Sequence, residues 1–300
     1  MFKLSKVKTG YLIEKLIVIY ILFTSQAVMA EYYLKEDADL LSERSAGEKQ
    51  SESNRYALTA YKQNYILPVT YDSEPNQQYE LLDPVEIKFQ ISFKVTLLEN
   101  LFNTNSELAV AYTQQNFWQA YNNKISSPFR ETNYEPEVFW GLHTDNEVLG
   151  MRLRYFMFGF VHQSNGRSQL LSRSWNRLYL NFIFKKGNFY LSLKPWYRIP
   201  EDPKNNPADA AGDDNPDILD YMGHGEIKAF YRFDKHEISM MFRNNISSDN
   251  KGAVQIDWAY PAGSKLKWYV QYFNGYGESL IDYNHNVNKI GVGILLTNWL

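Results

Sequence analysis

The sequence predicts an all-β protein, a 12-stranded antiparallel transmembrane β-barrel, on three observations. Residues 87–97 alternate apolar and polar side chains with period two, and eleven further segments have a strand-like pattern. The chain holds 23 Tyr, 18 Phe and 7 Trp, yet its mean hydropathy is −0.46 and no internal run approaches the roughly 20 apolar residues of a membrane helix. Short and long connections alternate, which is typical of outer-membrane barrels.

The first 30 residues are typical of a secretory signal peptide. Four lysines up to Lys15 precede the apolar run 16–23, and Val28-Met29-Ala30 offers a cleavage site. A membrane anchor is the alternative, but the run is short and no stop-transfer flank follows it. Removal of residues 1–30 takes away four Lys and one Glu, so the net charge changes from −3 to −6. That balance argues against a nucleic-acid-binding protein. The absence of cysteine excludes disulfides, thiolate zinc sites and a Cys nucleophile.

Residues 31–61 are polar and charge-rich, and we expect them to form a loose N-terminal extension. The barrel is expected to occupy residues 62–300. Tight turns are expected at 185–188, 233–236 and 261–264, and long loops at 119–136, 163–173 and 199–223. The twelve expected strands are 62–71, 85–98, 106–118, 137–144, 150–162, 174–186, 188–198, 224–234, 236–246, 252–261, 265–274 and 288–300.

A soluble secreted β-sandwich is the alternative fold, because alternation does not reveal whether the apolar face meets protein or lipid. The even strand count, the aromatic content, the signal peptide and a strand that reaches the C-terminus favour the barrel. In lipid, strands satisfy all their backbone groups only when they close into a barrel.

The candidate chemistry lies in the segment FVHQSNGRS, residues 160–168. A spacing of two places His162 and Ser164 on the same face of a strand end. A neutral imidazole within reach can take the proton of a serine hydroxyl, and Asn176 at the start of the next strand can orient the ring through its amide oxygen. A His two residues from a Ser is common at strand ends, so polar rim residues are the plain alternative. The sequence has no HExxH pair and no GxSxG elbow.

Strand parity suggests which way this group points. Asn176 shares even numbering with the apolar positions 178, 180, 182 and 184, so it is expected to face lipid. The strand that carries His162 is apolar on both faces, so its parity does not decide the side. A polar triad facing lipid is costly for structure but suits a lipid substrate. If the N-terminus is periplasmic, counting strands places the long loops and this site at the outer rim.

The sequence resembles the outer-membrane phospholipase A family of Gram-negative bacteria over most of residues 60–300. The segments that carry the resemblance are 112–114, 126–136, 162–167, 172–179, 194–197, 213–217 and 275–284 (GYGESLIDYN). The resemblance implies a calcium-dependent hydrolase of the acyl esters of phospholipids and lysophospholipids that is active as a homodimer in the outer membrane. It implies that Ser164 is the nucleophile, His162 the base and Asn176 the orienting residue.

The resemblance also implies a Ca²⁺ site made of the Arg167 carbonyl, the Ser172 hydroxyl and Ser126 from the partner chain. The Gly166 N–H and calcium-bound water would meet the oxyanion. Gln114 matches a glutamine at the family's dimer interface; without the resemblance, it would be interpreted as an interfacial polar residue. Many relatives have an acidic residue where Gln169 stands, and Asp214 is expected to supply part of that charge.

Two other functions are compatible with the pattern. One is a barrel with a structural or passive-pore role and a relict site, and the other is a soluble secreted β-protein. The intact set of Ser164, His162, Asn176, Ser126 and Ser172 argues against the first of these.

Overall fold

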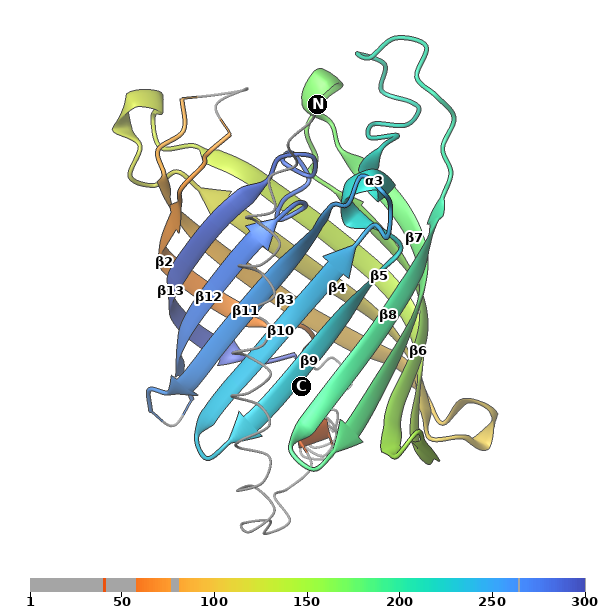
Figure 1. Ribbon diagram of the computed structural model, residues 1–300. Helices are drawn as coiled ribbons and strands as arrows, with labels where there is room; N and C mark the ends of the chain where they lie inside the picture. Colours follow the sequence, from red (N-terminus) through yellow and green to blue (C-terminus); the bar gives the residue numbers. More distant parts are fainter. Residues whose placement is uncertain (1–39, 42–57, 77–80, 264, 300) are drawn as a thin grey trace, which may run out of the picture. The chain divides into compact units, whose positions relative to one another are not determined.

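The computed structural model describes residues 40–41, 58–76, 81–263 and 265–299. The expected signal peptide, and the expected extension apart from residues 40–41 and 58–61, lie outside the described residues. Within the described part, twelve strands form a closed antiparallel barrel (Figure 1), as predicted. They are β2 (Asn64–Asp72), β3 (Val85–Glu99), β4 (Ser106–Trp118), β5 (Phe129–Val148), β6 (Met151–Ser164), β7 (Ser174–Lys186), β8 (Phe189–Ile199), β9 (Gly225–Phe233), β10 (His236–Asn244), β11 (Gly252–Pro261), β12 (Lys267–Gly275) and β13 (Val287–Thr297).

Each strand from β3 to β12 pairs with its neighbours in sequence, and β2 lies between β13 and β3, which closes the sheet. A further two-residue strand, β1 (Thr59–Ala60), pairs with β3 beyond the start of β2. Because Tyr65 pairs with Gln90 and Ala60 with Phe93, β1 continues the line of β2 along β3. The end of the segment expected to be a loose extension is therefore attached to the barrel wall.

The start of β5 was predicted wrongly. We expected a loop over 119–136 and a strand over 137–144, whereas β5 begins at Phe129 and ends at Val148. Its first residues pair with β4, for example Asn133 with Gln115. The side chains of Glu131 and Asn133 are buried inside the barrel, so both faces of this stretch carry polar residues. Periodicity of hydrophobicity is lost where the buried face is itself polar.

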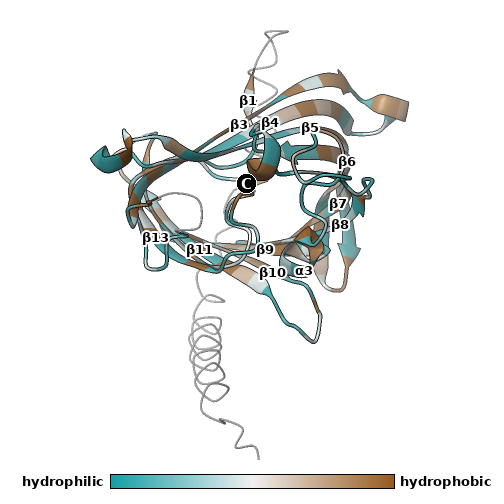
Figure 2. Cartoon of the chain, turned by 90° about the horizontal axis from the view of Figure 1, so that it is seen from above, coloured by the Kyte–Doolittle hydropathy of each residue, from teal (hydrophilic) through white to brown (hydrophobic). Residues whose placement is uncertain are grey.

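The barrel is apolar outside and largely polar inside. On β7, the outward Leu178 and Leu180 are 37% and 36% exposed, whereas the inward Trp175 and Tyr179 are almost fully buried. Viewed along the barrel, the ribbon alternates between brown and paler or teal positions along β3 to β6 (Figure 2). A polar interior behind an apolar outer surface is the arrangement of outer-membrane barrels.

Ion pairs cross the interior. Lys289 Nζ lies 2.9 Å from Glu86 Oε1 and 2.6 Å from Glu278 Oε2, and Lys88 Nζ lies 2.8 Å from the other oxygen of Glu278. Arg130 binds both Glu86 and Asp282. Burial alone would raise the pKa of the Glu278 carboxyl, but Lys289 and Lys88 hold it below its usual value. These pairs connect β3, β5 and β13 with the segment between β12 and β13.

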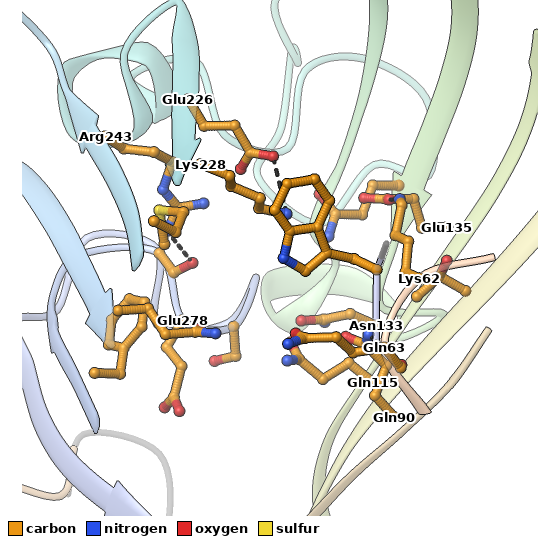
Figure 3. A pocket seen from close by; sticks show the side chains of 18 of the residues that line it. Lys62, Gln63, Gln90, Gln115, Asn133, Glu135, Glu226, Lys228, Arg243 and Glu278 are labelled. Atoms are coloured by element: carbon orange, nitrogen blue, oxygen red, sulfur yellow. Dashed lines mark hydrogen bonds and ion pairs between the residues drawn. The ribbon is translucent and has the colours of Figure 1, made fainter. Parts of the chain in front are cut away.

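A polar cavity of about 180 Å³ lies among the interior side chains (Figure 3). Cationic and anionic groups alternate around it, including Lys62, Glu135, Glu226, Lys228 and Arg243. Water-sized space lined by charged groups is expected to be hydrated.

The two ends of the barrel differ. At one end the connections between strands are two to six residues long, as between β7 and β8. At the other end lie the longer loops 73–84, 119–128, 165–173, 200–224, 245–251 and 276–286. Loop 276–286 folds into the mouth of the barrel, where Leu280 and Ile281 are buried and their N–H groups donate to Asn133 Oδ1 and Glu131 Oε1. The short helix α3 (Ile218–Met222) lies at the same end (Figure 1).

Candidate active site

His162 and Asn176 face each other on the outer surface of the barrel. They are direct partners in the β6–β7 register, at the end of β6 nearest the long loops. His162 Nδ1 and Asn176 Oδ1 are 2.8 Å apart. Because an amide oxygen only accepts, this contact places a proton on His162 Nδ1, and in a neutral imidazole Nε2 is then the unprotonated nitrogen. A neutral imidazole in this tautomer has its basic nitrogen available.

The amide orientation of Asn176 is fixed from its other side. Its Nδ2 donates to Glu201 Oε1 at 3.2 Å, so Oδ1 is directed at the imidazole. Ser164 follows His162 by two residues on the same strand and pairs with Ser174 of β7. Among the described residues, no hydrogen bond joins the Ser164 hydroxyl to His162. The two side chains share the outer face, about 6.6 Å apart along the strand.

The burial of β6 settles the side that sequence parity left open. Tyr155, Met157 and Val161 are buried in a cluster inside the barrel, whereas Phe158 and Phe160 are exposed outside. His162 and Ser164 continue the outward series. The face of β6 opposite to them is apolar because the interior holds an apolar cluster as well as the ion pairs.

The loop after β6 is held by one buried side chain, Asn165, which is 4% exposed. Its Oδ1 accepts from the N–H groups of Arg167 and Arg173, at 3.2 and 3.0 Å. Its Nδ2 donates to the Leu171 carbonyl at 2.9 Å and to Glu131 at 3.5 Å. These contacts bring the two ends of the loop together and shape the turn between them.

Gly166 occupies the left-handed region, with φ +64°, and a Cβ there would lie 3.0 Å from the Tyr134 ring. Glycine therefore fits this position without strain. Within the described part of the chain, the Gly166 N–H has no acceptor and the Arg167 carbonyl has no donor. Both groups are available to a ligand at the outer surface.

The Arg167 side chain is anchored toward the interior. Its Nε lies 3.3 Å from Glu131 Oε2, and its guanidinium also donates to the Arg130 carbonyl. Glu131 in turn accepts from Asn133 and from the Ile281 N–H of the inserted loop. The backbone that carries the Arg167 carbonyl is thus fixed by contacts that reach into the barrel mouth.

Ser172 and Asp214 come together from two different loops. The Ser172 hydroxyl donates to Asp214 Oδ2 at 2.7 Å, and the Ser174 hydroxyl lies 3.2 Å from the same oxygen. Lys204 Nζ is 2.5 Å from Asp214 Oδ1 and neutralises much of its charge. Gln169 is exposed, with φ +56°, and heads the 3₁₀ turn Gln169–Leu171. In the described residues there is no cluster of three or more His, Cys, Asp or Glu side chains that could hold a metal.

Ser126 and Gln114 stand apart from this group. Ser126 is exposed in loop 119–128, with φ +61°. Gln114 lies on the outward face of β4, where it accepts from the Tyr112 hydroxyl and donates to Asn116 Oδ1, both at 2.8 Å. The next outward side chain, Asn116, is 2% exposed, and its Nδ2 has no partner among the described residues. A polar row on an outer surface expected to meet lipid is costly unless another surface covers it.

Two residues of the site were not assigned from the sequence. Asn165 lies inside the motif but was not given a role, and its position before a glycine was a usable signal for a turn. Glu201 follows Ile199-Pro200 in a long loop, and no spacing in the sequence connects it with Asn176.

Comparisons with known proteins identify the family of the chain. A model of the phospholipase A1 family matches residues 41–296. Phospholipase A1 of Klebsiella pneumoniae is 39% identical over 256 residues, which cover 83% of this chain and 85% of that protein. The protein of the same name from Escherichia coli strain K12 is 38% identical, with 83% and 84% covered.

Solved structures show the same fold. The outer-membrane phospholipase of Salmonella typhi, solved as a dimer with bound calcium, is 38% identical and superposes with a TM-score of 0.75 over 82% of this chain and 94% of that one. Outer membrane phospholipase A from Escherichia coli gives the same TM-score and identity and is covered completely. The 12-stranded barrel, the family match and this degree of identity lead to one conclusion: the chain belongs to the phospholipase A1 family of outer-membrane β-barrel hydrolases.

Proposed function

We propose that this barrel hydrolyses acyl ester bonds of phospholipids and lysophospholipids with Ser164 as nucleophile, His162 as general base and Asn176 as orienting residue. The observation that carries the proposal is the 2.8 Å contact between His162 Nδ1 and Asn176 Oδ1 on the outer surface, with Ser164 two residues along the same strand. A base so oriented outside the barrel meets acyl chains rather than a lumen substrate.

The chemistry follows from the orientation. Ser164 Oγ attacks the acyl carbonyl while His162 Nε2 takes its proton, and the imidazolium is stabilised through the Nδ1–H bond to Asn176. The same proton passes to the leaving lysophospholipid or alcohol oxygen, and an acyl-enzyme remains. Water then attacks this ester, with His162 again as base, and releases the fatty acid. The Gly166 N–H, which has no acceptor among the described residues, donates to the oxyanion.

The residues present fit a calcium ion. The Arg167 carbonyl has no donor in the described part of the chain, and the Ser172 hydroxyl lies beside the Asp214 carboxylate, so the donors are the hard oxygens that calcium takes. We propose that Arg167 and Ser172 hold the ion, that Asp214 lies next to it, and that Ser126 of a second copy completes it. When bound, calcium would supply positive charge near the developing oxyanion. The dimeric, calcium-bound relative from Salmonella typhi supports this assignment.

A homodimer would also explain the row around Gln114. In a dimer of this chain, the amide of Gln114 would be covered by a second copy instead of lipid. The site would then lie at the rim with the long loops, at the level of the outer leaflet.

The test is fatty-acid release from phospholipid in mixed detergent micelles. We expect activity that needs calcium, is lost in chelator and is lost in Ser164→Ala. Ser168→Ala is the matched control, because Ser168 is an exposed serine of the same loop whose hydroxyl makes no hydrogen bond within the described residues. A Ser164→Ala protein that stayed as active as the parent would reject the nucleophile. A folded parent with no calcium-dependent release would favour the structural or pore alternative.

A further inference from the structure

Glu201 contacts the proposed catalytic group from the loop that follows β8. It follows Pro200 after the end of β8, at the start of the long loop that leads to α3 (Figure 1). Its Oε1 accepts from Asn176 Nδ2 at 3.2 Å, while Asn176 Oδ1 faces His162 Nδ1 at 2.8 Å. A continuous chain of donors and acceptors therefore joins the Glu201 carboxylate to the imidazole through one amide group.

The charge of Glu201 is not taken up by a neighbouring cation. Glu201 forms no ion pair with any described residue. Of the cations around it, Lys204 is paired with Asp214, and Arg198 with Asp213. Arg173, which lines the same cavity of about 380 Å³, donates to the carbonyls of Leu170 and Ser172.

The other charged groups around His162 point away from it. On the neighbouring strand β5, Glu135 and Glu137 face the interior and bind Lys62. On β7, Arg177 binds Glu135 inside the barrel. Glu201 therefore supplies the carboxylate nearest to the side of the imidazole that faces Asn176.

We propose that Glu201 is a positioning residue of the triad that acts through Asn176; this rests on the proposed function of Ser164 and His162. The carboxylate fixes the Asn176 amide with its oxygen toward the imidazole, because the flipped amide would place NH₂ against the Nδ1–H and oxygen against the carboxylate. It also polarises the amide, since hydrogen bonds in a chain strengthen one another.

In this arrangement, the negative charge of Glu201 acts on the imidazole through the Asn176 amide. A neutral asparagine stabilises an imidazolium less than a carboxylate does. With Glu201 behind it, the amide presents a more negative oxygen to the ring, while the full charge stays in the cavity lined by loop 200–224 and away from the acyl chains. A lipid-facing triad thereby avoids placing an ionised carboxylate in apolar surroundings.

The first test compares Glu201→Gln with Asp202→Asn. Gln keeps an oxygen for the Asn176 amide and removes the charge, whereas Asp202 is exposed and its side chain makes no hydrogen bond within the described chain. For Glu201→Gln we expect kcat to fall about fivefold, or about 1 kcal/mol, with KM little changed. The acid limb of the pH profile should move to lower pH, because protonated imidazole loses a nearby negative charge. Asp202→Asn should leave both unchanged.

The second test uses a background in which Glu201→Gln is expected to raise activity instead of lowering it. In Asn176→Asp, two carboxylates stand next to each other and disfavour each other's charge. In that background Glu201→Gln should raise activity about threefold or more, whereas in the parent it lowers activity. A role confined to holding the fold predicts a loss in both backgrounds. The folded fraction of each variant is measured by heat-dependent gel mobility.

The outcomes separate this inference from the proposed function. If Ser164→Ala retains activity, the triad itself is wrong. If Ser164→Ala is inactive while Glu201→Gln keeps the parent kcat and pH profile, only the role of Glu201 is overturned. A loss of activity on Glu201→Gln in both backgrounds also overturns it. Loss in the parent together with gain in Asn176→Asp supports it.

Discussion

Replacement of Asn165 by Ala should loosen the loop that carries the candidate calcium ligands while leaving the barrel intact. The substitution deletes two acceptor contacts, from the N–H groups of Arg167 and Arg173, and two donor contacts, to the Leu171 carbonyl and to Glu131. Because Asn165 is almost fully buried, water replaces these partners poorly. The strands on either side of the loop keep their backbone hydrogen bonds.

The magnitude follows from the bonds lost. Three of the four contacts are 3.2 Å or shorter, and each such bond contributes about 1 kcal/mol net. A loss of about 3 kcal/mol changes the ratio of ordered to open loop by about 150-fold. If the ordered loop is the calcium-binding form, the calcium concentration for half-maximal activity should rise by one to two orders of magnitude, roughly. Global stability should change by less, because a local opening exposes only this loop.

The chain offers a matched control, Asn245→Ala in loop 245–251. Its Oδ1 accepts from the Ser247 and Lys251 N–H groups at 3.2 and 3.0 Å, and its Nδ2 donates to the carbonyls of Asp220 and Asp249. It therefore loses the same kinds of contact in a loop far along the sheet from the site. Fatty-acid release titrated with calcium is the assay. A calcium response of Asn165→Ala equal to those of the parent and of Asn245→Ala would refute the reasoning.

Two further predictions concern the second copy and the interior. Ser126→Ala and Ser164→Ala homodimers should both lose most activity. Mixing the two proteins should restore part of it, because one site of each mixed dimer holds both serines. If mixed dimers are shown to form and activity does not recover, Ser126 of the second copy is not a ligand. Glu278→Gln removes the carboxylate that pairs with Lys88 and one of the two close carboxylates around Lys289, which keeps Glu86. It should lower the free energy of unfolding by about 3 kcal/mol, measured by heat-dependent gel mobility. In the parent, the pKa of Glu278 is lowered, so the ionised carboxylate stabilises the fold above the usual Glu pKa. This stabilisation is lost as the pH falls through the lowered pKa. Acid should therefore destabilise the parent more than it destabilises Glu278→Gln.

The sequence was sufficient for the barrel because one face of each strand had to be apolar. Eleven of the twelve expected strands differ from those observed by three residues or fewer at either end, and the pairing of His162 with Asn176 follows from two strands joined by one loop. The outward direction of Asn176 was predicted from the apolar positions 178 to 184 and is confirmed by their exposure. The catalytic roles of these residues remain proposals.

The sequence was not sufficient where the buried face is polar or the contact is distant. The start of β5 was missed because Glu131 and Asn133 face an interior of charged groups, so burial leaves no apolar signal there. Glu201 was missed because its contact with Asn176 depends on how a 25-residue connection, residues 200–224, leaves the end of β8. Local pattern does not determine the path of such a loop.

The position of the site on the outside of the barrel has a physical consequence for how it is held. Lipid offers no hydrogen-bond partners, so polar groups that must be fixed there have to be fixed from the protein side. The structure does this through the mouth of the barrel: Glu131 accepts from the Ile281 N–H inside and pairs with Arg167 at the rim. Asn165 adds backbone contacts between these two levels. The charged interior therefore also orients the Arg167 carbonyl and the Gly166 N–H, which have no hydrogen-bond partner among the described residues.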